Sequence, residues 1–186
     1  TIADMDDDGD PDFEVLPWST QRNLGDGSLV LEGVALPPAP PGLVYTGQGH
    51  VGDWDGDGDE DRLELAVGSS GIAGLALLEN RGSGVFASAG LVSGPTGLNV
   101  FPFYLEDGLA ADVDGDHDLD LVLRCFTAPV GGFNRTGWLR NDGPAGFVFQ
   151  ASWNGFVATR CVDMDGDGIV DLFGSQAWLV GANFQD

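Results

Sequence analysis

The chain has 186 residues, of which 42% are hydrophobic, and its 30 acidic and 7 basic residues give a formal net charge of −23. The hydrophobic content is enough for the core of one ordinary domain. Binding of nucleic acid or of an anionic membrane needs a Lys/Arg patch, so we exclude both as partners. We also expect no membrane span, because no apolar run approaches the roughly 20 residues that cross a bilayer.

The negative charge is concentrated in four nine-residue segments, which hold 21 of the 30 acidic residues. They read DMDDDGDPD from Asp4, DWDGDGDED from Asp53, DVDGDHDLD from Asp112 and DMDGDGIVD from Asp163. Their first residues are 49, 59 and 51 positions apart. A period near 50 residues is typical of repeat architectures. We therefore interpret the chain as a single domain of four repeats, approximately residues 1–49, 50–108, 109–159 and 160–186, the last of them incomplete.

Apolar segments follow the acidic segments in a constant order. The first set reads DFEVLPW, RLELAVG, DLVLRCF and DLFGSQAW, and the second LALLENRGSG, GWLRNDGPAG and AWLVGAN. The third set reads LVLEGVAL, VFASAGL and FVFQASW, and short HVGD, GLAAD and ATRCVD segments lead into the next acidic segment. Turn residues separate them, and no helical apolar stripe persists for three turns. Each repeat is thus predicted to form four short strands in sheets that pack face to face.

Two insertions interrupt the period. Residues 36–47, LPPAPPGLVYTG, are Pro-rich and predict a rigid extended loop. Residues 93–108 carry Phe101, Phe103 and Tyr104, which we interpret as covering a sheet edge; the alternative is a loop in which Phe101 and Tyr104 contact a ligand.

The two cysteines, Cys125 and Cys161, lie 36 positions apart, which excludes a CxxC metal or redox motif. A disulfide and two free thiols both stay open, because pairing depends on a geometry that sequence alone does not supply.

The four acidic segments share one template, with Asp at positions 1, 3, 5 and 9 and a turn residue at position 6. Alternate residues of a tightly turning loop can direct carboxylates at one centre, and Gly at position 6 permits the positive φ that the turn needs. Position 7 would add a backbone carbonyl. Such oxygen ligands favour Ca²⁺, whereas the chain has no Cys or His set for zinc or copper. We expect about four Ca²⁺ ions, one per repeat.

The template differs from an EF-hand, which requires a bidentate Glu at position 12 and flanking helices. Position 12 holds Val15, Glu64, Leu123 and Gly174, and the flanking segments are predicted strands.

The pattern D-x-D-x-D-G-x-x-D between two strands, repeated about every 50 residues, resembles the FG-GAP/VCBS repeats of integrin-type β-propellers over essentially the whole chain. The resemblance implies an all-β propeller of four-stranded antiparallel blades, with a Ca²⁺ loop between strands 1 and 2 of each blade. It implies carboxylate ligands at Asp4, Asp6, Asp8 and Asp12; Asp53, Asp55, Asp57 and Asp61; Asp112, Asp114, Asp116 and Asp120; and Asp163, Asp165, Asp167 and Asp171. The position-7 carbonyls belong to Asp10, Asp59, Asp118 and Ile169.

Two features qualify this resemblance. His117 occupies position 6 of the third segment, where the others have Gly, so we expect a weaker or distorted third site. Four repeats either close as a four-bladed ring or form part of a larger propeller that other copies or chains complete.

From these features we expect a calcium-binding extracellular module that acts as an adhesion, ligand-binding or structural scaffold. Sites of this kind need millimolar Ca²⁺, so we expect a secreted, periplasmic or cell-surface location. A protein or glycan is the expected ligand. The alternative is a lectin that uses Trp18 and Trp153 as sugar platforms. Part of a secreted polysaccharide-active enzyme is a third reading, but two histidines without triad-like spacing favour a protein that is not an enzyme.

Overall fold

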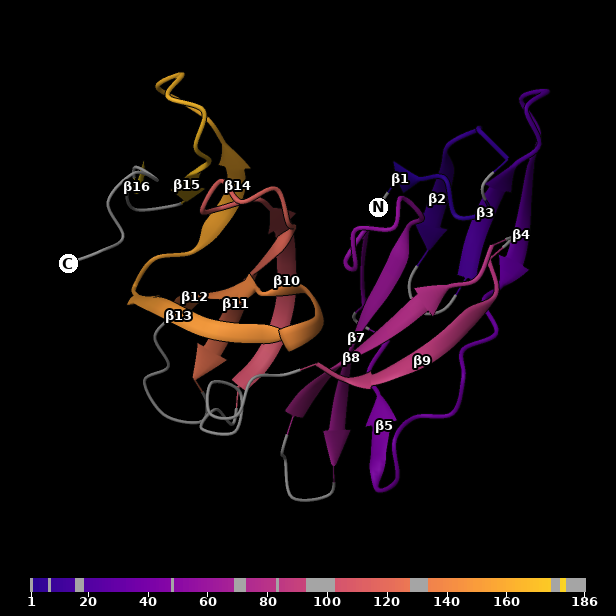
Figure 1. The fold of residues 1–186 in the computed structure, drawn as a ribbon, viewed down its shortest axis with the longest axis horizontal. Coiled ribbons are helices and arrows are strands. Elements are labelled where there is room, and N and C mark those ends of the chain that lie inside the picture. The colour runs from indigo at the N-terminus through magenta and orange to yellow at the C-terminus, as the bar shows by residue number, and fades with distance from the viewer. Residues whose placement is uncertain are drawn as a thin grey trace. The chain divides into compact units, whose positions relative to one another are not determined.

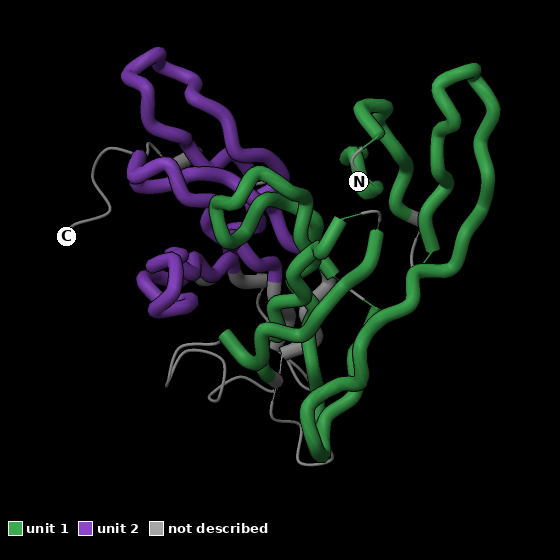
Figure 2. The backbone as a smooth tube through the Cα atoms, turned by 45° about the vertical axis from the view of Figure 1, so that its right-hand side comes forward, with its two compact units in different colours: residues 1–92 green, residues 93–186 purple. Residues whose placement is uncertain are grey.

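A computed structural model describes residues 2–6, 8–15, 19–47, 49–68, 73–82, 84–92, 103–127, 134–174 and 178–179 (Figure 1). The described residues form antiparallel β-sheets and one 3₁₀ turn, η2 (Gly143–Ala145), so the predicted all-β class is confirmed. No helix in these ranges has the length and hydropathy needed to cross a membrane. The chain divides into two compact units, residues 1–92 and residues 93–186 (Figure 2).

Unit 1 contains two sheets. Sheet A has the order β1 (Ile2–Ala3), β2 (Asp12–Val15), β3 (Ser19–Asn23) and β4 (Leu29–Gly33). Sheet B contains β5 (Leu43–Tyr45), β6 (His50–Gly52), β7 (Asp61–Gly68), β8 (Ala73–Asn80) and β9 (Phe86–Leu91). Strands β5 and β6 pair with opposite ends of the same edge of β7, so together they act as one interrupted first strand.

Unit 2 also contains two sheets. Sheet C has the order β10 (Phe103–Ala111), β11 (Asp120–Thr127), β12 (Asn134–Asn141) and β13 (Phe147–Asn154). Sheet D has the order β14 (Ala158–Val162), β15 (Asp171–Gly174) and β16 (Trp178–Leu179). Every strand pair in both units is antiparallel and joins neighbours in sequence, apart from the β5–β7 pair.

Each unit buries apolar side chains between its two sheets. The core of unit 1 contains Met5, Val51, Leu78 and Phe86. The core of unit 2 contains Val113, Val122, Trp138, Phe156, Ala158 and Leu172. Since both cores include residues of the acidic segments or of the strands beside them, packing within each unit positions these segments.

Three elements differ from the expected pattern. Strand β3 reads STQRN and has no apolar segment, so the sequence did not signal it. Strand β5 lies inside the insertion that was predicted to be a loop, and β10 includes the last residues of the second insertion. Both strands begin a sheet before the repeat boundaries expected at residues 50 and 109, because the first strand of each repeat is longer than the short segment next to the acidic loop.

Candidate metal centres

Each acidic segment forms a loop between two paired antiparallel strands. The loops connect β1 to β2, β6 to β7, β10 to β11 and β14 to β15, and each ends with the position-9 Asp as the first residue of the second strand. The four loops therefore occupy equivalent places in four sheets.

The position-1 carboxylate organises the backbone of every loop. Its Oδ2 atom accepts a hydrogen bond from the backbone N–H of position 6, at 2.8 Å for Gly9 to Asp4, 3.2 Å for Gly58 to Asp53, 3.0 Å for His117 to Asp112 and 3.0 Å for Gly168 to Asp163. Position 6 has positive φ in each loop: 92° at Gly9, 100° at Gly58, 78° at His117 and 90° at Gly168. Among the described residues, His117 alone combines a side chain with positive φ.

This backbone brings three carboxylates together in each loop. The groups are Asp4, Asp6 and Asp8; Asp53, Asp55 and Asp57; Asp112, Asp114 and Asp116; and Asp163, Asp165 and Asp171. Within each group, one oxygen per residue lies within 4.8 Å of the others. The first three groups are the expected positions 1, 3 and 5, whereas the fourth combines positions 1, 3 and 9. All of these atoms are carboxylate oxygens, the donors that Ca²⁺ and Mg²⁺ prefer.

The position-9 carboxylates hold the strands together. Asp12, Asp61, Asp120 and Asp171 are buried, and Oδ2 of each accepts the backbone N–H of position 2, at 3.0, 3.2, 3.1 and 3.0 Å. In the first three repeats, Oδ1 accepts the N–H of Asn23, Asn80 or Asn141, at 2.8, 2.9 and 2.8 Å. Position 9 therefore has a structural role beyond the ligand role that the template predicted.

The predicted position-7 residues contribute backbone contacts. The N–H groups of Asp10, Asp59, Asp118 and Ile169 donate to the position-5 carboxylates at 2.9–3.0 Å. These bonds curl the chain around the acidic groups irrespective of the side chain at position 7, which is consistent with Ile169 occupying that position.

Burial, with a smaller contribution from neighbouring carboxylates, raises the pKa values of several loop aspartates. Burial raises the pKa of Asp61 to about 6 and that of Asp120 to about 6. Burial raises the pKa of Asp55, and the neighbouring Asp57 carboxylate adds to this shift. Burial and the neighbouring Asp116 raise the pKa of Asp114 in the same way. A bound cation would reverse the direction of these shifts, because it favours the charged carboxylates.

Two arginines partly neutralise the loops. Arg22 lies 3.1 Å from Asp6, and Arg140 lies 3.9 Å from Asp114. Asp6 nevertheless has a buried Oδ1 without a hydrogen-bond partner. That oxygen is a free ligand atom of the first acidic group.

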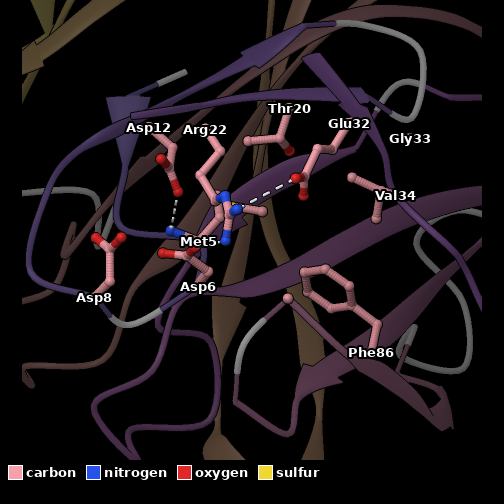
Figure 3. Close-up of a pocket in the computed structure, with 11 residues that line it drawn as sticks. Met5, Asp6, Asp8, Asp12, Thr20, Arg22, Glu32, Gly33, Val34 and Phe86 are labelled. Atoms are coloured by element: carbon pink, nitrogen blue, oxygen red, sulfur yellow. Dashed lines mark hydrogen bonds and ion pairs between the residues drawn. The ribbon is translucent and has the colours of Figure 1, made fainter. Parts of the chain in front are cut away.

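A cavity of about 310 Å³ lies beside the first loop, within unit 1 (Figure 3). It is lined by Met5, Asp6, Asp8, Asp12, Thr20, Arg22, Glu32, Gly33, Val34, Gly84 and Phe86. The Arg22 guanidinium lies between Asp6 and Glu32, at 3.1 and 3.4 Å. Asp6 Oδ1, Thr20 Oγ1 and Arg22 Nε are buried without hydrogen-bond partners, so the cavity wall offers unused donors and acceptors.

No protein-family model, curated protein or solved structure matches the chain.

The aromatic residues that were candidates for ligand binding are only partly described. Trp18 and Phe101 lie outside the described residues, and Tyr104 lies in β10 without a described side chain. Trp153 packs against the core of unit 2. Its burial favours a packing role over an exposed sugar platform.

Of the two cysteines, the structure describes the side chain of Cys161. Cys161 carries a free thiol that packs against the core of unit 2. Burial raises its pKa to about 11. The side chain of Cys125 lies outside the described residues.

A second motif accompanies the acidic template in the first three repeats, where the sequence predicts no more than a turn. Asn23, Asn80 and Asn141 each begin an Asn-x-Gly triplet, and their Oδ1 atoms accept the N–H of the glycine at 3.1, 3.0 and 3.1 Å. Since the same asparagines donate to the position-9 Asp, they connect the loop to the turn after the next strand. The recurrence of Asn-x-Gly after the first three acidic segments was the signal that could have revealed this contact.

Proposed function

We propose that the chain is a calcium-binding repeat protein of FG-GAP/VCBS type, in which one Ca²⁺ stabilises each acidic loop. The observation that carries this proposal is the repetition of one loop geometry at four equivalent places, with three carboxylates converging in each. Three anionic groups held within 4.8 Å repel one another unless a cation lies between them.

The donor set also favours Ca²⁺ over other metals. Each loop offers carboxylates and backbone carbonyls on a flexible turn, which suits the six to eight oxygen ligands of Ca²⁺. Mg²⁺ demands a stricter octahedron and keeps more of its waters. Because Arg22 and Arg140 already neutralise part of the first and third loops, we expect these two sites to bind Ca²⁺ more weakly than the second.

The bound ions would have a structural role. At about 1 mM free Ca²⁺, sites with dissociation constants on the order of 0.1–1 mM each stabilise the folded state by roughly 0.4–1.4 kcal/mol. Four such sites contribute an amount comparable with the net stability of a domain. We propose that the chain is a calcium-stabilised extracellular scaffold of propeller type, with its sheets as blades, that presents a surface for adhesion or ligand binding.

The test is isothermal titration calorimetry and thermal unfolding of the chelated protein with added Ca²⁺ or Mg²⁺. We expect about four Ca²⁺ per chain and a higher melting temperature with Ca²⁺ than with Mg²⁺. Asp57→Asn should remove or weaken one site. Asp59→Asn removes the same charge from position 7 of the same loop and should leave the stoichiometry unchanged. Equal melting temperatures in Ca²⁺ and in excess chelator would refute the proposal.

A second candidate function is the binding of a small polyhydroxylated ligand, such as a monosaccharide, in the cavity beside the first loop. It is favoured by the buried, unpartnered atoms of Asp6, Thr20 and Arg22 next to the apolar Phe86. Buried polar groups without partners are costly, and hydroxyl groups of a ligand would satisfy them. A glycan array should then show binding that Thr20→Val weakens, whereas absence of binding to any saccharide would eliminate this candidate.

A further inference from the structure

The two sheets of each unit meet in the same way. In the strand that follows each acidic loop, the side chains at positions 10 and 11 point to opposite faces of the sheet. In unit 1, Arg62 at position 10 of sheet B forms a buried ion pair with Glu14 at position 11 of sheet A. In unit 2, Leu172 at position 10 of sheet D shares a core with Val122 at position 11 of sheet C. The position-10 face of the later sheet thus packs on the position-11 face of the earlier one.

Sheet A has an uncovered position-10 face. Phe13 is 41% exposed, whereas Arg62, Leu121 and Leu172 at the same position are 0% exposed. The cross-strand row through Phe13 continues to Ile2 on one side and through Gln21 to Leu31 on the other. Ile2, Phe13, Leu29 and Leu31 are all exposed and form what we call the outer face of sheet A.

Sheet D has the opposite face uncovered. Phe173, at position 11, is exposed, whereas Leu63 and Val122 at the same position are fully buried. The apolar residue at position 2 shows the same contrast: Met164 is 56% exposed, while Met5, Trp54 and Val113 are 3%, 2% and 1% exposed. Val162, Met164 and Phe173 form what we call the outer face of sheet D.

We propose that the outer face of sheet A in one copy of the chain docks against the outer face of sheet D in a second copy. One copy thus carries an uncovered position-10 face on sheet A and an uncovered position-11 face on sheet D, and these are the two kinds of face that pack together in the A–B and C–D contacts. Large exposed apolar side chains gathered on one sheet face mark interaction surfaces. The occupant of each face is therefore the other face of another copy, in a heterologous, head-to-tail contact.

The chemistry of the two faces supports this pairing. Phe13 of one copy meets Phe173 of the other, at the positions where Arg62 meets Glu14 in unit 1, and the two rings form an aromatic pair. The residues that define the two faces are all apolar, so none of them adds a carboxylate to the contact despite the net charge of −23. The proposed contact is made by apolar side chains and involves neither the acidic carboxylates nor the cavity; Met164 lies in the fourth acidic loop, so the substitutions that test the contact are placed in the strands.

The first measurement is sedimentation equilibrium of the whole chain over a wide range of concentrations, with Ca²⁺ and with chelator. We expect an assembly of two or more copies. Phe13→Asp in sheet A and Phe173→Asp in sheet D should each shift the chain to the monomer. Val85→Asp is the control, because Val85 is also an exposed apolar residue, 61% exposed, but lies in the turn between β8 and β9. Circular dichroism of each variant verifies that it remains folded.

Mixing and rescue test the head-to-tail pairing. Phe13→Asp retains an intact sheet D face and Phe173→Asp retains an intact sheet A face, so an equimolar mixture should form a heterodimer that neither variant forms alone. The double variant Phe13→Arg with Phe173→Glu copies the Arg62–Glu14 pair and should associate more strongly than either single variant. A monomeric wild type at all concentrations, an unchanged assembly in both face variants, or a monomeric mixture would overturn the proposal.

Discussion

The backbone N–H of Asn141 donates a 2.8 Å hydrogen bond to Oδ1 of Asp120, a carboxylate that also accepts the Val113 N–H and the Trp138 indole N–H at Oδ2. Asp120 is fully buried and thus holds the third loop, strand β12 and the following turn in one arrangement. Asp120→Asn replaces one acceptor by an amide NH₂ that faces a donor. We expect a loss of about 1–3 kcal/mol in the free energy of unfolding.

Urea unfolding in the presence of chelator measures this loss without a contribution from metal. Asp118→Asn is the matched control, since its predicted contribution comes from the backbone rather than from the side chain, and it should change stability by less than about 0.5 kcal/mol. If Asp120→Asn and Asp118→Asn lowered the free energy of unfolding by the same amount, the structural role that we assign to position 9 would be refuted.

His117 occupies a left-handed conformation, with φ of 78°, that glycine fills in the other three loops. For residues with a side chain this conformation costs roughly 1–2 kcal/mol, whereas the extra flexibility of glycine in the unfolded chain costs about 0.5–1 kcal/mol. His117→Gly should therefore raise the free energy of unfolding by up to about 1 kcal/mol. In the opposite sense, Gly58→Ala, at φ of 100°, should lower it. Urea unfolding of both variants in chelator provides the comparison, and a destabilised His117→Gly would contradict it.

The strands and the loops were predictable because their signals are local. Alternating or continuous apolar residues with Gly and Asn turns identify strands such as β7 and β11, and the phase of the aspartates identifies the loops. Strand β3 gives no such signal. Its Thr20 and Arg22 face the cavity of unit 1, and it exists as a strand because β2 and β4 pair with its two edges.

The roles of individual aspartates could not be separated by sequence. Asp57 and Asp61 are equivalent in a ligand template, yet Asp57 is exposed at the acidic group and Asp61 is buried against the backbone of Trp54 and Asn80. This distinction depends on the fold of residues 19 positions away. The exposed faces of sheets A and D likewise became visible only when burial at equivalent positions could be compared.

Arg62 is fully buried between Glu14 and Glu64, with its Nε 2.6 Å from Glu64. Arg62→Met would leave two buried carboxylates without a cation, and we expect a loss of about 3–5 kcal/mol in the free energy of unfolding. Arg81→Met removes an exposed arginine that pairs with Glu79 and should cost less than about 1 kcal/mol. Urea unfolding near pH 7 distinguishes the two variants.

The pH dependence gives a second readout for Arg62→Met. Burial raises the pKa of Glu64, and Arg62 opposes that shift. Without Arg62 the pKa should rise further, so the folded variant binds a proton that the unfolded chain releases as the pH increases. The loss caused by the mutation should consequently be smaller at about pH 5 than at about pH 7, since a raised carboxyl pKa favours the folded state at low pH. A loss that is independent of pH would argue against buried charge as its cause.

Cys161 should be chemically inert in the folded protein. Its burial raises the thiol pKa to about 11, and only the thiolate reacts with alkylating agents. Near pH 8 we expect slow labelling by iodoacetamide in the native state and fast labelling in urea, measured on the Cys161 peptide by mass spectrometry so that Cys125 does not interfere. The raised pKa also implies that the contribution of this thiol to stability is complete below about pH 9 and is lost as the pH rises toward 11. Cys161→Ala should therefore lose less stability than the wild type as the pH rises over that interval. In the labelling experiment, rapid reaction of the native thiol would show that Cys161 is not shielded by the core of unit 2.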